Sequence, residues 1–153
     1  MDVIEIKKKL HKMCKKQIEK DIIVTTKAME DAQFEANQHK GAMESRYDTF
    51  KEEAQARVSG FAQQLHEKSK LLATIVNINP TNQHSQVAKG SVVETDKEHY
   101  FISAYIFDDP LTIAGKEYLP ISIESPLGQL LSGKKPGAEV ELMVGIIKII
   151  SVF

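Results

Sequence analysis

Two carboxylates, Glu44 and Asp48, are the residues whose type and spacing are best suited to chemistry. They are four residues apart, so a helix would bring both to one face. Carboxylate oxygens are the ligands that Mg²⁺ prefers in proteins, and two on one face could assist in holding such an ion. The same acids also suit the amino end of a helix, where negative charge favours the helix dipole. The residues alone leave both interpretations open.

A lysine-rich run near the amino end is the second candidate. Lys8, Lys12 and Lys15 would lie on one long helix, where they could contact nucleic-acid phosphates. A solvated helix face is the commoner explanation of such a run. The formal net charge of −1 gives the whole chain no attraction to nucleic acid, so any electrostatic contact would have to be local.

His11 and Cys14 are three residues apart and could form half of a zinc site, but no second pair with suitable spacing follows. Cys14 is the single cysteine, so no intramolecular disulfide can form. No signal-peptide pattern and no apolar stretch long enough to cross a bilayer is present, so a cytoplasmic protein without a membrane partner is expected.

The elements that would position these residues are two long helices. Apolar residues recur in steps of three or four, as one helix face requires, on both sides of a short glycine-containing turn. The pattern predicts an antiparallel coiled-coil hairpin over residues 1–76 with its tip near 37–43. The stripe residues are Ile6, Leu10, Met13, Ile18, Ile22, Met29, Ala32 and Ala36, followed by Met43, Tyr47, Phe50, Ala54, Val58, Phe61, Leu65 and Leu72.

The remaining chain predicts a small β domain, which makes the fold class α+β. Residues 77–86 form a polar linker, and the domain covers residues 87–153. Strands are expected over 87–95, 99–107 and 121–123, with a loop over 111–117 and a closing strand or strand pair over 138–153. Ser125 and Pro126 predict the start of a short helix over 127–131 that ends at Gly133. The expected sheet is antiparallel.

The segment 121–142 closely resembles the carboxy-terminal signature of the bacterial Gre transcript-cleavage factors. In that family a strand, a Ser-Pro, a short helix, a Gly-Lys and a Gly-x-x-Val-Glu-Val follow in this order. Residues 87–93 look like the family's entry strand, and Asn79-Pro80 falls where its linker lies. The resemblance covers residues 75–153, and the order of hairpin and domain is also that of the family.

The resemblance implies a domain like that of the FK506-binding proteins, which docks on RNA polymerase beside its secondary channel. The docking residues would be Ser125, Pro126, Leu127, Gly133, Lys134 and Lys135. The coiled coil would bring Glu44 and Asp48 to the catalytic Mg²⁺ of the polymerase, where hydrolysis of a backtracked transcript needs oxygen ligands for a second metal. The family's tip has an Asp soon after a Gly, whereas Gly41 here is followed by Ala42.

The expected function is therefore that of an elongation factor, not of an enzyme, with no cofactor of its own. It would contact nascent RNA and DNA only through the elongation complex, and it is expected to be a monomer. Two alternatives remain: a polymerase-binding regulator that does not promote cleavage, and a peptide-binding or chaperone-like module. The second is weaker because a prolyl isomerase needs an aromatic-lined pocket, and this half has no Trp and few aromatic residues.

Overall fold

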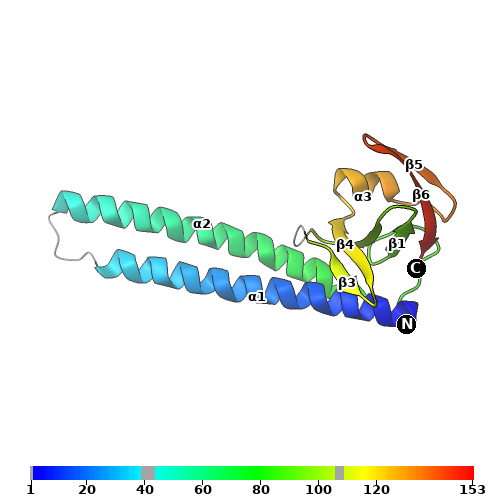
Figure 1. Ribbon diagram of the computed structural model, residues 1–153. Helices are drawn as coiled ribbons and strands as arrows, with labels where there is room; N and C mark the ends of the chain where they lie inside the picture. Colours follow the sequence, from blue (N-terminus) through cyan, green and yellow to red (C-terminus); the bar gives the residue numbers. More distant parts are fainter. Residues whose placement is uncertain (1, 39–43, 106–108) are drawn as a thin grey trace. The chain divides into compact units, whose positions relative to one another are not determined.

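The computed structural model describes residues 2–38, 44–105 and 109–153. For residues 44–47 it describes the backbone but not the side chains. Helix α1 spans Val3–Gln38 and helix α2 spans Glu44–Val76 (Figure 1). The contacts divide the chain into two compact units, one made of Met1–Gln17 with Ala73–Phe153 and the other of Ile18–Leu72. The predicted domain limits at residues 76 and 87 stay predictions, and the predicted tip lies mostly outside the described residues.

The unit Ile18–Leu72 is a pair of helical segments whose seam is formed largely by small side chains. Ile18, Thr25, Ala32 and Ala36 of α1 are buried, and they recur in steps of seven and four, as in a coiled coil. Ala54 of α2 is also buried. An ion pair joins the two helices, because Arg57 Nη2 lies 2.7 Å from Glu35 Oε2. The predicted pairing of two amphipathic helices is confirmed for this unit.

In the other unit, the first turns of α1 pack on the sheet through a buried stripe. Ile6, Leu10 and Cys14 recur in steps of four and are all buried. Met13, which the sequence analysis placed in this stripe, is 38% exposed, so that assignment was wrong. Ser103 on the sheet is buried beside Cys14, so the first turns of α1 cover this sheet face.

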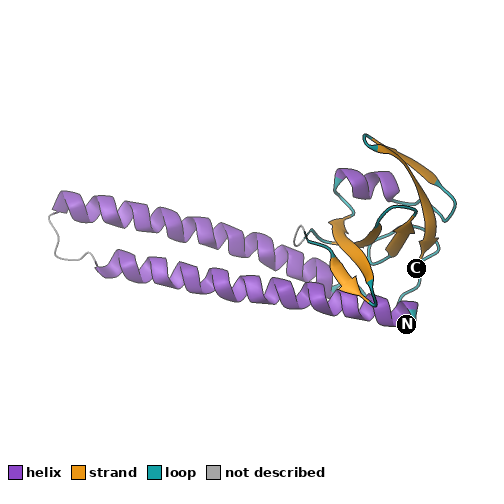
Figure 2. Ribbon diagram, viewed as in Figure 1, coloured by secondary structure: helices purple, strands orange, loops and turns teal. Residues whose placement is uncertain are grey.

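The sheet has six strands in the order β3-β4-β2-β1-β6-β5 (Figures 1 and 2). Neighbouring strands are antiparallel except β2 and β4, which run parallel with Ile102 opposite Ile121. The sheet is therefore mixed, and the expectation of a wholly antiparallel sheet was wrong for this pair. The strands are β1 (Val92–Thr95), β2 (His99–Ser103), β3 (Leu111–Ile113), β4 (Lys116–Ser122), β5 (Glu139–Leu142) and β6 (Gly145–Val152).

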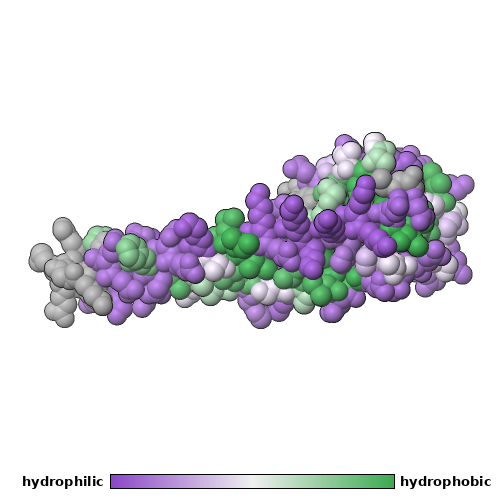
Figure 3. Space-filling view, turned by 90° about the horizontal axis from the view of Figure 1, so that it is seen from below, coloured by the Kyte–Doolittle hydropathy of each residue, from purple (hydrophilic) through white to green (hydrophobic). Residues whose placement is uncertain are grey.

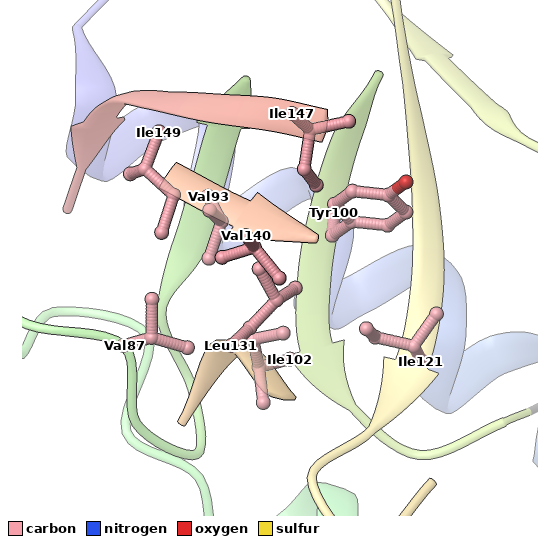
Figure 4. Close-up of a cluster of buried hydrophobic side chains, with 9 residues drawn as sticks. All are labelled: Val87, Val93, Tyr100, Ile102, Ile121, Leu131, Val140, Ile147 and Ile149. Atoms are coloured by element: carbon pink, nitrogen blue, oxygen red, sulfur yellow. The ribbon is translucent and has the colours of Figure 1, made fainter. Parts of the chain in front are cut away.

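The core of the sheet domain lies on the face opposite to the first turns of α1 and is closed by the short helix α3, Pro126–Leu131. Leu131 of α3 is buried among aliphatic side chains from β1, β2, β4, β5 and β6 (Figure 4). Alternation along each strand places these residues on one face. The cluster consists of Val87, Val93, Tyr100, Ile102, Ile121, Leu131, Val140, Ile147 and Ile149.

Two predicted strands were longer than the observed ones, the first at its amino end and the second at its carboxyl end. The strand expected from residue 87 begins only at Val92, because the preceding residues form a turn in which the Ser91 hydroxyl donates to Ala88 O. Gly90 adopts φ of +93°, which glycine tolerates at no steric cost. The strand expected over 99–107 ends at Ser103 in the described residues, and Phe107 lies outside them.

The loop expected over 111–117 is a β-hairpin. Strands β3 and β4 are joined by the two-residue turn Ala114-Gly115, with φ of +52° and +80°. Positive φ at both positions is the geometry of the tight hairpin turns that match strand twist. Leu111 and Ile113 are buried on either side of exposed Thr112, but three residues are too short an alternation to be recognised in the sequence.

The fold class predicted from the sequence, an amino-terminal helical hairpin followed by a small β domain with one short helix, is confirmed (Figure 2). Among the described residues, no helix combines the length and apolar character needed to cross a bilayer.

Candidate functional site

The segment that carries the sequence resemblance forms a capped helix fixed to the end of β4. The Ser125 hydroxyl accepts the backbone N–H of Gly128 at 3.0 Å and donates to the carbonyl of Ser122 at 2.6 Å. Pro126 stands at the first helical position, where its missing N–H costs nothing. The predicted start of this helix is confirmed, and Ser125 has a structural role in it.

Gly128 allows α3 to approach the sheet closely. A Cβ at this position would lie 2.1 Å from the carbonyl oxygen of Ser122, which real structures do not allow. The residue is buried, and the oxygen belongs to backbone that cannot turn aside as a side chain could. Glycine is therefore required here by packing, a role that was not predicted from the sequence.

The end of α3 is tied back to the entry of the sheet domain. Gly133 ends the helix with φ of +75°, as a left-handed capping residue does. Its N–H donates to Val87 O at 2.8 Å, and Val87 N–H donates to Lys134 O at 2.8 Å. These two bonds hold the segment after α3 in one position relative to the core.

The six predicted docking residues therefore divide into two groups. Ser125, Leu127 and Gly133 build the segment, since Leu127 packs partly against the core. Pro126, Lys134 and Lys135 are exposed and available to a partner. Leu130, which the sequence analysis left out, is 47% exposed on the same helix. We call the exposed set Pro126, Leu130, Lys134 and Lys135 the α3 surface.

The lysine run at the base of α1 is not one uniform face. Lys8 and Lys12 are exposed, while Lys15 is partly buried. Lys7 is only 1% exposed, and its ammonium donates to the carbonyl of Asn82 and to His84 Nδ1, the latter at 3.1 Å. The helical spacing from Lys7 to Leu10 and Cys14, three and then four residues, is the signal that could have placed Lys7 on the buried side.

Burial perturbs both partners of this contact. Desolvation lowers the pKa of Lys7 to about 8, because a buried ammonium loses its hydration. Burial, and then the positive charge of Lys7, lower the pKa of His84. Both groups therefore favour their neutral forms more than they would in water. The contact joins the first turns of α1 to the segment between α2 and β1.

His11 and Cys14 also serve packing within this unit. His11 Nε2 donates to the carbonyl of Ile75 at 2.7 Å, which satisfies an acceptor in the last turn of α2. Cys14 is fully buried, and burial raises the pKa of its thiol to about 12. Within the part of the chain that the structure describes, no group of three or more His, Cys, Asp or Glu is arranged to hold a metal ion.

The two predicted tip carboxylates lie at the beginning of α2. Glu44 is its first residue, but the side chain of Glu44 lies outside the described part. Asp48 is exposed one turn later. The helix places positions 44 and 48 on one face, as the spacing requires. Their role toward a metal ion stays a prediction.

A cleft that the sequence did not predict opens on the sheet domain, with a volume of about 560 Å³. Its lining comes from the β1–β2 turn, the first residue of β2, the residue before β3, the β3–β4 turn and β4, and it includes Lys97, His99 and Leu119. No Phe, Tyr or Trp is among its described lining residues. His99 Nδ1 is buried and has no hydrogen-bond partner in the described structure.

Comparison with known proteins gives a likeness to solved structures alone. No protein-family model and no curated protein matches the sequence. The crystal structure of GreA factor homolog 1 (Gfh1) of Thermus thermophilus is 13% identical, with 91% of this chain and 94% of that chain covered and a TM-score of 0.38. A second structure, of the transcription factor Gfh1, is 14% identical, with 90% and 92% covered and a TM-score of 0.38. A likeness of this degree says nothing about function.

Proposed function

We propose that this protein is a transcription factor that binds RNA polymerase and acts on elongation complexes. The observation that carries the proposal is that segment 121–142, which resembles the Gre signature, forms the local structure its residues imply: a strand, a Ser-capped helix, a glycine-ended turn and another strand. A helical hairpin precedes this domain in the chain. Both halves of the resemblance thus have a structural counterpart.

The α3 surface is the proposed docking site on the polymerase. Lys134 and Lys135 supply positive charge, and Pro126 and Leu130 supply apolar contact on the neighbouring helix. An apolar contact with charges beside it is the usual composition of a protein interface. The hydrogen bonds from Ser125 and Gly133 keep these residues in place before a partner binds, which reduces the entropy cost of binding.

The acids at the start of α2 are the proposed functional end of the hairpin. In this proposal Glu44 and Asp48 reach the polymerase active centre and provide oxygen ligands near its catalytic Mg²⁺. The chain would then stimulate the hydrolytic activity of the polymerase and would need no metal site of its own. A regulator that occupies the polymerase without cleavage is the second candidate, which the Ala42 in place of the family's tip Asp favours.

The test is a binding and cleavage assay with backtracked elongation complexes of the RNA polymerase from the same organism. We expect the wild type to bind and to shorten the transcript, and Glu44→Ala plus Asp48→Ala to bind without shortening it. Binding without cleavage by the wild type would identify a non-cleaving regulator. Absence of binding would overturn the proposal.

Charge reversal on the α3 surface tests the docking site separately. Lys134→Glu and Lys135→Glu should each weaken binding to the polymerase by about tenfold, because an interfacial attraction becomes a repulsion. Lys89→Glu is the matched control, since Lys89 is exposed in the same unit but lies outside the α3 surface. If Lys134→Glu and Lys135→Glu bound the polymerase as tightly as Lys89→Glu does, the protein would contact the polymerase through another surface.

A further inference from the structure

Helix α1 has a face in the unit Ile18–Leu72 that the hairpin does not use. Ile23 is 70% exposed and Phe34 is 64% exposed, although both are large and apolar. Ile23 is two residues from buried Thr25, and Phe34 is two residues from buried Ala32. Two residues correspond to a rotation of about 200° around the helix. Ile23 and Phe34 therefore lie on the side of α1 that faces away from its seam with α2.

These two residues belong to a regularly spaced stripe. Ile23, Lys27, Glu30 and Phe34 follow one another in steps of four, three and four, which is the heptad spacing of a helix–helix contact. Lys27 and Glu30 are exposed, as the apolar pair is. We call these four residues the outer stripe. In space-filling view, hydrophobic groups interrupt the hydrophilic surface along the hairpin (Figure 3).

The local sequence gives no internal reason for the apolar members. Residues 22–26 are all β-branched, which disfavours a helix interior relative to Ala or Glu. Thr25 is buried and Thr26 donates its hydroxyl to Ile22 O at 2.8 Å, but Ile23 and its neighbour Val24 meet solvent. A contact outside this chain would account for them.

The order of the outer stripe is complementary to itself. Along the helix, the outer stripe has an apolar residue, a positive one, a negative one and again an apolar one. When a second copy runs in the opposite direction, its negative residue therefore lies against the positive residue of the first copy. In the antiparallel register that sets Ile23 against Phe34 of the second copy, Lys27 meets Glu30 of the second copy. Both pairs occur twice about a two-fold axis, as an isologous interface requires. A parallel arrangement in register would bring like charges together.

We propose that two copies of this chain associate through their outer stripes, with the two α1 helices antiparallel. Two pairs of Ile23 with Phe34, one at each end of the stripe, give a small apolar contact, and interfaces under about 1,200 Å² belong to weak complexes. The dissociation constant of the dimer should therefore be on the order of tens of micromolar. The proposal differs from the monomer expected from the sequence, and it does not depend on polymerase binding.

Sedimentation equilibrium across a range of protein concentrations tests the apolar part. The wild type should shift from monomer to dimer as concentration rises, and Ile23→Glu should weaken association by at least about tenfold, because a carboxylate replaces the buried contact. Gln55→Glu adds the same charge at an exposed position of α2 and should leave association unchanged. Circular dichroism checks that both variants keep their helices.

Charge exchange tests the register. Lys27→Glu and Glu30→Lys should each weaken association, whereas the double variant should recover it, because opposite charges then meet again. A mixture of the two single variants should form a heterodimer for the same reason. A wild type that stays monomeric, an Ile23→Glu variant that associates as the wild type does, or a double variant that fails to recover would each overturn the proposal.

Discussion

Gly128 is the residue whose side-chain size controls the packing of α3 on β4. Gly128→Ala places a methyl group 2.1 Å from Ser122 O in the starting geometry, so helix and strand must separate. Overpacking of this kind should lower the free energy of unfolding by about 3 kcal/mol, measured by urea denaturation.

Gly60→Ala is the control for this prediction. Gly60 lies inside α2, and nothing stands within 4 Å of the Cβ it would gain. Alanine has the higher helix propensity, so Gly60→Ala should raise the free energy of unfolding by up to about 1 kcal/mol. If both alanine variants changed stability alike, the close approach at Gly128 would not be the cause.

Lys7 shows what a sequence pattern hides at the residue scale. It belongs to a run of three lysines, so its composition indicated a solvated face, yet it is buried against Asn82 and His84. Its partners stand more than seventy positions away, and only the fold brings them together. The helical spacing of Lys7 from the buried residues Leu10 and Cys14 indicates that Lys7 is also buried. The interpretation of the sequence gave more weight to its charge.

Among the helices and strands, an element could be predicted where the residues that define it lie close together in the sequence. Helix α3 was predicted because its cap, its proline and its final glycine all lie within nine residues of one another. The β3–β4 hairpin was missed because the alternation in β3 covers only three residues. The parallel pairing of β4 with β2 was missed because the two strands are separated by an intervening segment. The cleft was missed for the same reason, since its lining comes from residues 97–99 and from residues 110–119.

The packing of the first turns of α1 on the sheet can be followed through Cys14. A pKa of about 12, raised from 9.0, leaves about a thousandfold less thiolate than in an exposed cysteine at the same pH. The native protein should therefore react with iodoacetamide more slowly than the urea-unfolded protein by at least this factor. The rate can be measured by mass spectrometry.

A control moves the thiol by one residue. Met13 is 38% exposed, so Met13→Cys combined with Cys14→Ala presents the thiol to solvent on the same helical turn. This variant should react at the rate of an ordinary cysteine in the native state. Rapid reaction of the wild type under native conditions would mean that α1 leaves the sheet readily.

At the scale of the whole molecule, the Lys7 contact links stability to pH. The pKa of Lys7 is lowered from 10.5 in the unfolded chain to about 8 in the folded one, so between these values the unfolded state binds more protons. The contribution of Lys7 to the free energy of unfolding should therefore rise with pH from about 8 to about 10.5. His84, whose pKa is also lowered, contributes in the same direction below 6.5.

Urea denaturation at several pH values measures this dependence. Lys7→Met keeps a chain of similar length without a titrating group, so the rise in stability above pH 8 should be smaller in the variant than in the wild type. Parallel curves for the two proteins over this range would show that Lys7 is not responsible.

The pairing of β1 determines when the protein can finish folding during its synthesis. Val92 and Phe153 exchange both backbone hydrogen bonds, at 2.8 and 3.0 Å, so β1, an inner strand of the sheet, cannot complete its pairing before Phe153 has been synthesised. The helical hairpin needs only contacts between neighbouring helices and can form while the ribosome still holds the remaining residues. The β domain must then close later than the hairpin, and until β6 is available β1 exposes an unpaired edge.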